Sequence, residues 1–371
     1  MGALSALGTD VAAHLTGVRA GVVPFRPLAG LLGSASPHAH RPGAWIETRA
    51  ALTHRKWSPV TMAALQVARE AISAADWSSD QLREAALVVG TSRGNAAGWL
   101  GPWPGRRPFK LMSASNTIHS EPAAAISIEF GITGPNHVLA SGCSAGLDAV
   151  GVAMMMVRAG LAPRALAVAV DLPLVPLLLD NYAQSGLLAE SFTLDPYAPG
   201  SHGFIPGEGA AAIAMDGSCP GNVELVHYSC NADARDPVGI PADGGLTPAL
   251  LAAAIKHTGV PSAVCPHATG TAVQAKADPA VFRKSFTIMP TLHLLKPFTG
   301  HTIGASGLLE SVILAAFLRE GKLPPNLPGR HAPDGMSLPD SELPFSGLAV
   351  KLSHGMGGHN ALLAIATGSH A

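Results

Sequence analysis

The sequence predicts an α/β fold in which strands and helices alternate along the chain. Short continuous apolar runs such as 165–170 have the composition of strands that are buried on both faces of a sheet. Longer segments of helical character lie between these runs, and Gly and Pro residues mark the breaks. This alternation is typical of proteins built from layers of helices and sheets.

The composition is that of a large, weakly charged protein. Of its 371 residues, 47% are hydrophobic and 13% are charged, and the net charge is −1. Such a chain can bury an extended core and a subunit interface, whereas its charge argues against nucleic acid as the main partner. The length suits two domain-sized units. The turn-forming segment 216–221 is the expected boundary, which predicts domains 1–217 and 218–371.

The cysteines and the chain start indicate a cytoplasmic protein. The spacing of the cysteines resembles neither a metal-binding pair nor a small disulfide framework, so reduced thiols are expected; they are Cys143, Cys219, Cys230 and Cys265. The N-terminus lacks the basic and apolar segments of a signal peptide. The most apolar stretch, 165–179, is interrupted by Asp171, Pro173 and Pro176, so no membrane-spanning helix is expected.

In the first half, residues 2–8 fit the end of a first strand and its turn. A buried strand is expected at 88–90, and a helix at 123–130 that Gly131 closes. A strand over 137–140 then leads into a long helix over 144–159. After these, 165–170 and 211–215 are the next predicted strands.

Between those two strands, the segment 194–207 is rich in Pro, Gly and Ser and is expected to be a surface excursion. The second half begins with a strand at 223–226, and a further strand is expected just before His267. A helix over 305–319 follows. The last predicted strands lie near Leu348 and Leu362.

Cys143 lies between the strand at 137–140 and the helix that follows it. A helix N-terminus carries unpaired N–H groups and the positive end of the macrodipole, which favour a thiolate. Cys143 is therefore a candidate nucleophile. For this residue taken alone, the alternative is a small buried side chain without a chemical role.

Two histidines occur in segments that are rich in Gly and Thr. His267 lies in the segment 266–271 and His301 in the segment 296–305. A neutral imidazole donates at one ring nitrogen and accepts at the other, so two of them can share the stabilisation of a reacting carbonyl. A glycine-rich segment, 353–360, precedes the end of the chain.

These three side chains, in these frames and in this order, resemble the β-ketoacyl synthase family of the thiolase superfamily. The resemblance extends over nearly the whole chain. It implies a five-layer αβαβα fold of two similar halves, the first carrying Cys143 and the second carrying both histidines and the glycine-rich loop. It also implies decarboxylative Claisen condensation: Cys143 carries an acyl thioester, and His267 and His301 stabilise the enolate that forms from malonyl-(acyl carrier protein). No cofactor or metal is implied, because phosphopantetheine of the carrier protein holds the substrates.

The resemblance assigns roles to further residues and partners. Lys296 and Glu310 would form a buried ion pair that orients the histidine-bearing loops. The N–H groups of Cys143 and Met356 would form an oxyanion hole, and Met356 would occupy the gate of the acyl site. Phe204 would lie in the acyl pocket. The expected partners are an acyl carrier protein and a second subunit, either identical or a related ketosynthase or chain-length factor.

Several positions depart from the usual elongating synthase. Met356 stands where Phe is usual, His354 and His359 replace an aromatic and a small residue, and Ala268 replaces Gly. These differences favour a divergent member that serves fatty-acid, polyene or polyketide synthesis. The alternative is a non-catalytic partner that resembles chain-length factors, although such partners commonly lack the cysteine. A thiolase that uses coenzyme A is disfavoured because the two histidines in these segments match the decarboxylating branch. An initiating synthase is disfavoured because those enzymes usually pair His with Asn.

Overall fold

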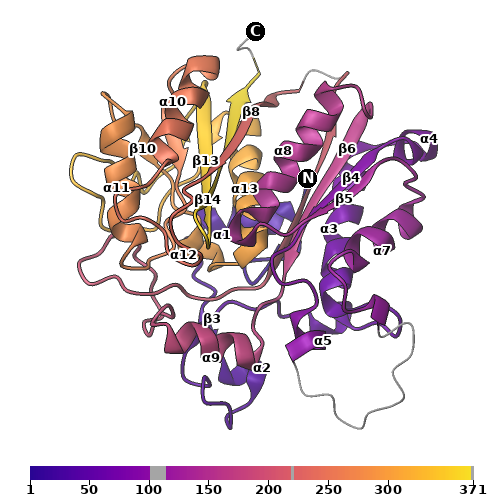
Figure 1. Cartoon of the computed structure of the whole chain (residues 1–371), viewed down its shortest axis with the longest axis horizontal. Helices are drawn as coiled ribbons and strands as arrows, with labels where there is room; N and C mark the ends of the chain where they lie inside the picture. Colours follow the sequence, from indigo (N-terminus) through magenta and orange to yellow (C-terminus); the bar gives the residue numbers. More distant parts are fainter. Residues whose placement is uncertain (101–113, 219–220, 369–371) are drawn as a thin grey trace.

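The computed structural model describes residues 1–100, 114–218 and 221–368, so Cys219 lies outside the described residues. Its framework is a pair of five-stranded sheets that stand next to each other (Figure 1). The first sheet has the order β1-β7-β6-β4-β5 and the second has the order β10-β9-β13-β14-β8. Because the first sheet ends with β7 at Asp216 and the second begins with β8 at Val223, the two sheets draw on different halves of the chain.

The first sheet contains the strands that the apolar runs of the first half predict. Its members are β1 (Gly2–Ser5), β7 (Gly209–Asp216), β6 (Arg164–Asp171), β4 (Ala86–Gly90) and β5 (Asn136–Leu139). Strands β4, β5 and β6 are parallel, whereas β7 runs antiparallel to both β6 and β1. The β6 side chains from Ala165 to Asp171 are all buried, as expected for a strand that is covered on both faces.

The second sheet repeats this mixture of parallel and antiparallel pairing. Its members are β10 (Thr291–Leu292), β9 (Ala263–Cys265), β13 (Leu348–Gly355), β14 (His359–Thr367) and β8 (Val223–Ala232). Strand β9 is parallel to β10 and β13, and β14 is antiparallel to β13 and β8. The predicted strands at 223–226, before His267, and near Leu348 and Leu362 lie within this sheet.

Helices complete five layers, which confirms the predicted thiolase-like αβαβα fold. Helices α3 (Pro59–Ala75) and α7 (Glu121–Phe130) cover the outer face of the first sheet, and α10 (Thr247–Thr258) and α11 (Gln274–Ser285) cover that of the second. Between the sheets lie α8 (Ala145–Arg158) and α13 (Ser306–Arg319), which contact both (Figure 1). Every α13 residue from Ser306 to Leu318 is buried, as expected for a helix that is apolar all round.

Shorter elements connect these layers. The helices are α1 (Val11–Arg19), α2 (Ala29–Leu32), α4 (Ser79–Arg83), α5 (Ala96–Leu100), α9 (Pro176–Gln184) and α12 (Lys296–Thr299). Two strand pairs are formed by β2 (Arg26–Pro27) with β3 (Pro42–Gly43) and by β11 (Lys322–Leu323) with β12 (Leu343–Pro344). The 3₁₀ turns are η1 (Arg49–Leu52), η2 (Gly142–Ser144) and η3 (Ile303–Ala305). Within the described residues, no helix has the length and apolar character that a membrane span requires.

The segment 194–207 corrects one prediction, because its second part is buried instead of exposed. Phe204 and Ile205 are 5% and 0% exposed. A side chain at Gly203 would overlap the backbone at Leu188, and one at Gly207 would lie 2.8 Å from the carbonyl oxygen of Thr299. Glycine at these positions lets two backbone segments approach closely inside the protein. Composition alone does not distinguish such buried glycines from those of a surface turn.

Candidate active site

Cys143 lies at the junction of the two halves, in the turn η2 between β5 and α8. Gly142 has a φ of 62°, a left-handed conformation that lets the chain turn sharply before the cysteine. Cys143 is buried, and its Sγ lies 3.3 Å from Nε2 of His301. The Ser353 hydroxyl of β13 donates a 3.0 Å hydrogen bond to the Cys143 carbonyl, which fixes the turn against the second sheet.

The structure brings the two predicted histidines to the same place. His267 follows β9, His301 lies between α12 and η3, and their ring centroids are 5.4 Å apart at an interplanar angle of 89°. Nδ1 of His301 lies 3.1 Å from the Ser306 hydroxyl. Nδ1 of His267 is buried and has no hydrogen-bond partner within the described ranges. Both side chains are 2% exposed.

The protonation of Cys143 differs from the sequence-based prediction. Burial raises the pKa of Cys143 to about 11, although the positive charges of Arg93 and Lys296 oppose the rise. This balance of burial against nearby charges favours a neutral thiol at rest, whereas the position at a helix N-terminus predicted a thiolate. Burial and the charge of Lys296 also hold the pKa of His301 well below its usual value, so its imidazole is neutral.

A buried charge cluster lies behind the histidines. Lys296 and Glu310, which were predicted to pair, form an ion pair of 2.7 Å with both side chains 1% exposed. Sequence reasoning missed Lys351 of β13, whose Nζ lies 2.6 Å from the other oxygen of Glu310 and donates to the carbonyl oxygen of Pro266 at 3.0 Å. A lysine within the apolar run Leu348–Leu352 was the signal that could have revealed it.

Asp171 is a second residue that the sequence analysis missed. It is fully buried at the end of β6 and accepts hydrogen bonds from the backbone N–H groups of Ser92, Arg93 and Gly304, each at 2.8–2.9 Å. It therefore ties the loop after β4 to the loop that follows His301. The break in the apolar run at Asp171 was visible in the sequence, but its partners lie far away along the chain.

Phe204, which the resemblance assigns to an acyl pocket, lies against His301. Its ring contacts His301 edge to face with a centroid distance of 5.1 Å, and it contacts Tyr182 of α9 in the same way at 5.4 Å. Phe204, Tyr182 and Cys143 belong to one buried apolar cluster, to which α9 also contributes Leu178 and Leu179. The surroundings of the cysteine are thus apolar on this side.

The glycine-rich loop between β13 and β14 lies beside the Cys143 turn. A Cβ atom on Gly142 would be 3.7 Å from the backbone nitrogen of Met356, while the Met356 side chain is 41% exposed. The two unusual histidines face different neighbours. His354 places its ring 5.4 Å from that of His267, and His359 bonds Asp148 of α8 at 2.8 Å.

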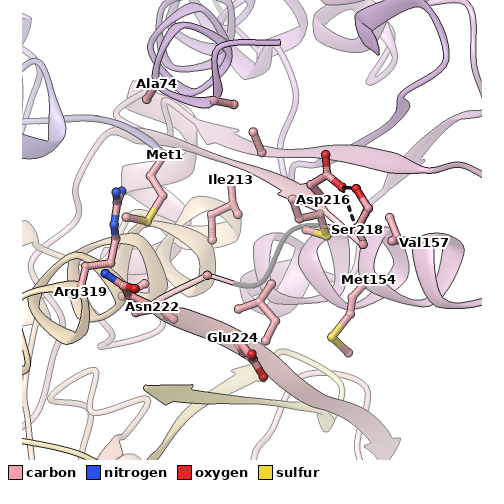
Figure 2. A pocket seen from close by; sticks show the side chains of 18 of the residues that line it. Met1, Ala74, Met154, Val157, Ile213, Asp216, Ser218, Asn222, Glu224 and Arg319 are labelled. Atoms are coloured by element: carbon pink, nitrogen blue, oxygen red, sulfur yellow. Dashed lines mark hydrogen bonds between the residues drawn. The ribbon is translucent and has the colours of Figure 1, made fainter. Parts of the chain in front are cut away.

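A separate open pocket of about 870 Å³ lies where β7 and β8 meet α13 (Figure 2). Its lining includes Met1, Asp216, Glu224 and Arg319, and Asp216 already accepts hydrogen bonds from Ser218. None of the described lining residues is a cysteine or a histidine. The reactive groups therefore lie elsewhere, around Cys143. Within the described ranges, no group of three or more His, Cys, Asp or Glu residues is arranged to hold a metal ion.

Comparisons with known proteins agree on one family. The model of the beta-ketoacyl synthase N-terminal domain matches residues 43–217, and that of the C-terminal domain matches residues 223–330. Polyketide synthase ThaG of Burkholderia thailandensis is 29% identical over 313 residues, which are 76% of this chain and 5% of that protein. The 3-oxoacyl-[acyl-carrier-protein] synthase 2 of Staphylococcus aureus is 25% identical over 264 residues, 64% of each protein. The chain thus spans less than two thirds of the length of these curated relatives.

Solved structures share the fold. The ishigamide ketosynthase/chain length factor superposes with a TM-score of 0.86 at 20% sequence identity. The superposition covers 99% of the present chain and 98% of the ishigamide chain. A type II polyketide synthase acyl-carrier protein in complex with its ketosynthase superposes with a TM-score of 0.84 at 21% identity, and the same shares of the two chains are covered.

Proposed function

Because the chain belongs to the β-ketoacyl synthase family, we propose that it catalyses decarboxylative Claisen condensation in fatty-acid, polyene or polyketide biosynthesis. The acyl group is carried on Cys143, and the malonyl unit is carried on phosphopantetheine of an acyl carrier protein, without a further cofactor. The observation that carries this proposal is the 3.3 Å contact between Cys143 Sγ and His301 Nε2, with His267 beside it in a buried site.

In the first step, the sulfur of Cys143 attacks the carbonyl carbon of an acyl thioester. The new S–C bond forms as the bond to the carrier thiol breaks. Since the thiol is neutral at rest, its proton passes to Nε2 of His301 and then to the departing carrier thiolate. Nδ1 of His301 carries a proton throughout this transfer, and the Ser306 hydroxyl can accept from it. The same hydroxyl can donate to Nδ1 when Nε2 carries the proton, as the second step requires.

In the second step, the malonyl thioester loses CO₂ and becomes an enolate. His267 and His301 donate N–H groups to the enolate oxygen, which neutral imidazoles can do. The enolate carbon attacks the acyl carbonyl on Cys143, a C–C bond forms, and the Cys143 sulfur leaves and takes up one proton from solvent. The N–H groups of Cys143 and Met356 stabilise the tetrahedral oxyanion.

The remaining residues position this machinery. The pair Lys296–Glu310 holds the His301 segment, and Phe204 shapes the acyl pocket. The domains 1–217 and 218–371 contribute the nucleophile and the two histidines, respectively. A cytoplasmic location accords with the free thiols of Cys143, Cys230 and Cys265.

We further propose that the protein acts as a dimer, with itself or with a related subunit, and that it receives its substrates from an acyl carrier protein. Strand β5 forms an edge of the first sheet, and its Asn136 and His137 are exposed. Helix α7, which contacts β5, leaves Ile128 65% exposed. An exposed edge strand flanked by an apolar side chain is a ready site for pairing with a second subunit.

The test is the intact mass of the protein after exposure to acyl carrier proteins bearing different chains. We expect an adduct of one acyl group on the unaltered protein and none on Cys143→Ala. Circular dichroism serves as the control for folding. If the unaltered protein forms no adduct with any chain, the alternative of a non-catalytic partner resembling chain-length factors replaces this proposal.

A further inference from the structure

Arg93 occupies the loop that follows β4, at the same end of the first sheet as Cys143. Strands β4 and β5 are parallel, so their carboxyl ends, which lead to Arg93 and Cys143, meet at one edge. The backbone at Arg93 is held firmly, because its N–H group donates to the buried Asp171 carboxylate at 2.9 Å. The point at which this side chain leaves the backbone is therefore fixed by the fold.

The Arg93 side chain reaches the apolar cluster around Cys143. Its Cζ lies 5.9 Å from the centroid of the Tyr182 ring. From there a series of ring contacts leads to the reactive atoms: Tyr182 contacts Phe204, Phe204 contacts His301, and His301 contacts Cys143. The charge of Arg93 also acts on the sulfur, since it opposes the rise that burial causes in the pKa of Cys143.

Two donor groups in this region have no acceptor of regular geometry. Nε of Arg93 and the hydroxyl of Tyr182 are buried atoms without such a hydrogen-bond partner within the described ranges, and Tyr182 is 3% exposed. The Arg93 side chain lies close enough to the Tyr182 oxygen to oppose the rise that burial causes in its pKa, but an oxygen that accepts from Arg93 still keeps its own proton to donate. Among the described residues, no carboxylate forms an ion pair with Arg93. Buried polar atoms are nearly always hydrogen-bonded, so two unsatisfied donors in one pocket indicate a missing acceptor. An arginine cannot accept, and its unpaired positive charge favours an oxygen that bears negative charge.

We propose that Arg93 and Tyr182 make the pocket selective for acyl chains that carry an acceptor oxygen, a carboxylate or a ketone, at a distance from the thioester. This inference rests on the proposed function, in which Cys143 carries the acyl chain. A chain with a methyl end leaves both donors desolvated and unpaired, whereas an oxygen-bearing chain satisfies them. Arg93 and Tyr182 are specificity-determining residues and take no part in bond formation.

The experiment is a competition for Cys143 among eight-carbon acyl chains on the same carrier protein. One chain ends in methyl, one ends in carboxylate, and one bears a ketone near its end. The unaltered protein should prefer an oxygen-bearing chain by on the order of 10- to 100-fold, the scale of hydrogen bonds to a charged group. Arg93→Met should bring the ratio close to one, and Tyr182→Phe should reduce it several-fold. The better oxygen-bearing chain identifies which oxygen is recognised.

The ratio separates selectivity from reactivity. Loss of Arg93 also changes the pKa of Cys143, but this change affects all chains alike and leaves their ratio untouched. Arg69→Met is the matched control, because Arg69 is exposed on α3 and pairs with Glu129. It should leave the ratio unaltered. The same ratio in Arg93→Met and in the unaltered protein, or a preference for the methyl-ended chain in the unaltered protein, would overturn the inference.

A second measurement requires no acyl transfer. Free octanedioate should slow alkylation of Cys143 by iodoacetamide more than octanoate does, and this difference should disappear in Arg93→Met. If no chain acylates Cys143, the proposed function fails, and this protection experiment still decides the inference. Equal protection by the two acids would contradict it.

Discussion

At the scale of single residues, the chemistry depends on two neutral groups that face each other. Burial raises the pKa of Cys143 to about 11 and, with the Lys296 charge, lowers that of His301 well below its usual value. A buried thiolate–imidazolium pair is thus avoided at rest, and the proton moves only when a thioester is present. The 3.3 Å separation allows that transfer directly between the two side chains.

This protonation state predicts how Cys143 reacts with iodoacetamide. The thiolate is the nucleophile, so below a pKa of about 11 the rate should rise about tenfold per pH unit. We expect the alkylation rate to rise continuously between pH 7 and pH 10. The rate is measured by quenching the reaction at set times and quantifying the alkylated Cys143 peptide by mass spectrometry. The exposed Cys230 in the same protein is the internal comparison. A plateau for Cys143 below pH 9 would show that the helix N-terminus outweighs burial.

The histidines lead to a different expectation for each step. Replacing His267 or His301 with Ala should reduce condensation by on the order of 10²-fold or more, because each loses a donor to the enolate. Self-acylation should persist in part, and more fully in His267→Ala, since His301 is the residue that contacts the sulfur. Condensation is followed by product mass and acylation by protein mass. Undiminished condensation in both variants would contradict the assigned roles.

The three candidate residues that the structure brings together could be picked out from the sequence, because each lies in a local segment of Gly, Thr and apolar residues. The protonation of Cys143 could not, since burial is a property of the whole fold. Lys351 illustrates the same limit: a lysine in a strand was visible, but its pairing with Glu310 depends on how β13 packs against α13. The five layers followed from the family resemblance, whereas the alternation of elements predicted only the α/β class.

At the scale of elements, the charge cluster joins α12, α13 and β13. Glu310 of α13 lies between Lys296 and Lys351, and each of its two oxygens pairs with one of these buried lysines. Removal of one partner from a buried ion pair leaves a charge without compensation, which costs about 3–5 kcal/mol. Because Glu310 serves two lysines, the elements that carry the histidines depend on this one carboxylate.

We therefore expect Glu310→Gln to lower the free energy of unfolding by about 3–5 kcal/mol. Lys351→Met should cost less, because Glu310 then keeps Lys296 as its partner and no unpaired lysine remains. Urea unfolding followed by circular dichroism measures both variants. Equal losses in the two variants would argue against the central position of Glu310.

The glycine-rich loop is the second element with a testable role. Met356, the proposed gate residue, has its side chain 41% exposed, and Gly357 and Gly358 follow it with φ values of 83° and 77°. A flexible thioether between such residues adapts to differently shaped chains. Met356→Phe should shift the preference between competing acyl chains by about 1–3 kcal/mol. Competition between carrier-bound primers measures the shift, with iodoacetamide reactivity of Cys143 as the control; an unaltered preference would place the gate elsewhere.

At the scale of the whole molecule, the exposed edge of the first sheet is the proposed site at which subunits associate. On the β4 side, the backbone N–H groups of Leu87 and Thr91 donate to the carbonyl oxygens of Pro135 and Leu139, respectively. Every second residue of β5 therefore bonds to β4, and the N–H group of Val138 points away from β4 toward the free edge. A second subunit that extends the sheet would accept hydrogen bonds from such outward N–H groups and donate to the outward carbonyl oxygens.

Val138→Pro should therefore weaken the dimer while sparing the sheet, because proline removes one outward N–H group and is tolerated at a strand edge. Val138→Thr is the matched control, since it retains the N–H group and the branched shape. Sedimentation velocity at micromolar concentration should show dimers for the unaltered protein and for Val138→Thr, and a shift toward monomers for Val138→Pro. Near-normal circular dichroism of the proline variant would separate dissociation from unfolding. A monomer for the unaltered protein that retains full activity would exclude dimerisation as a requirement, and an intact Val138→Pro dimer would show that the subunits meet at another surface.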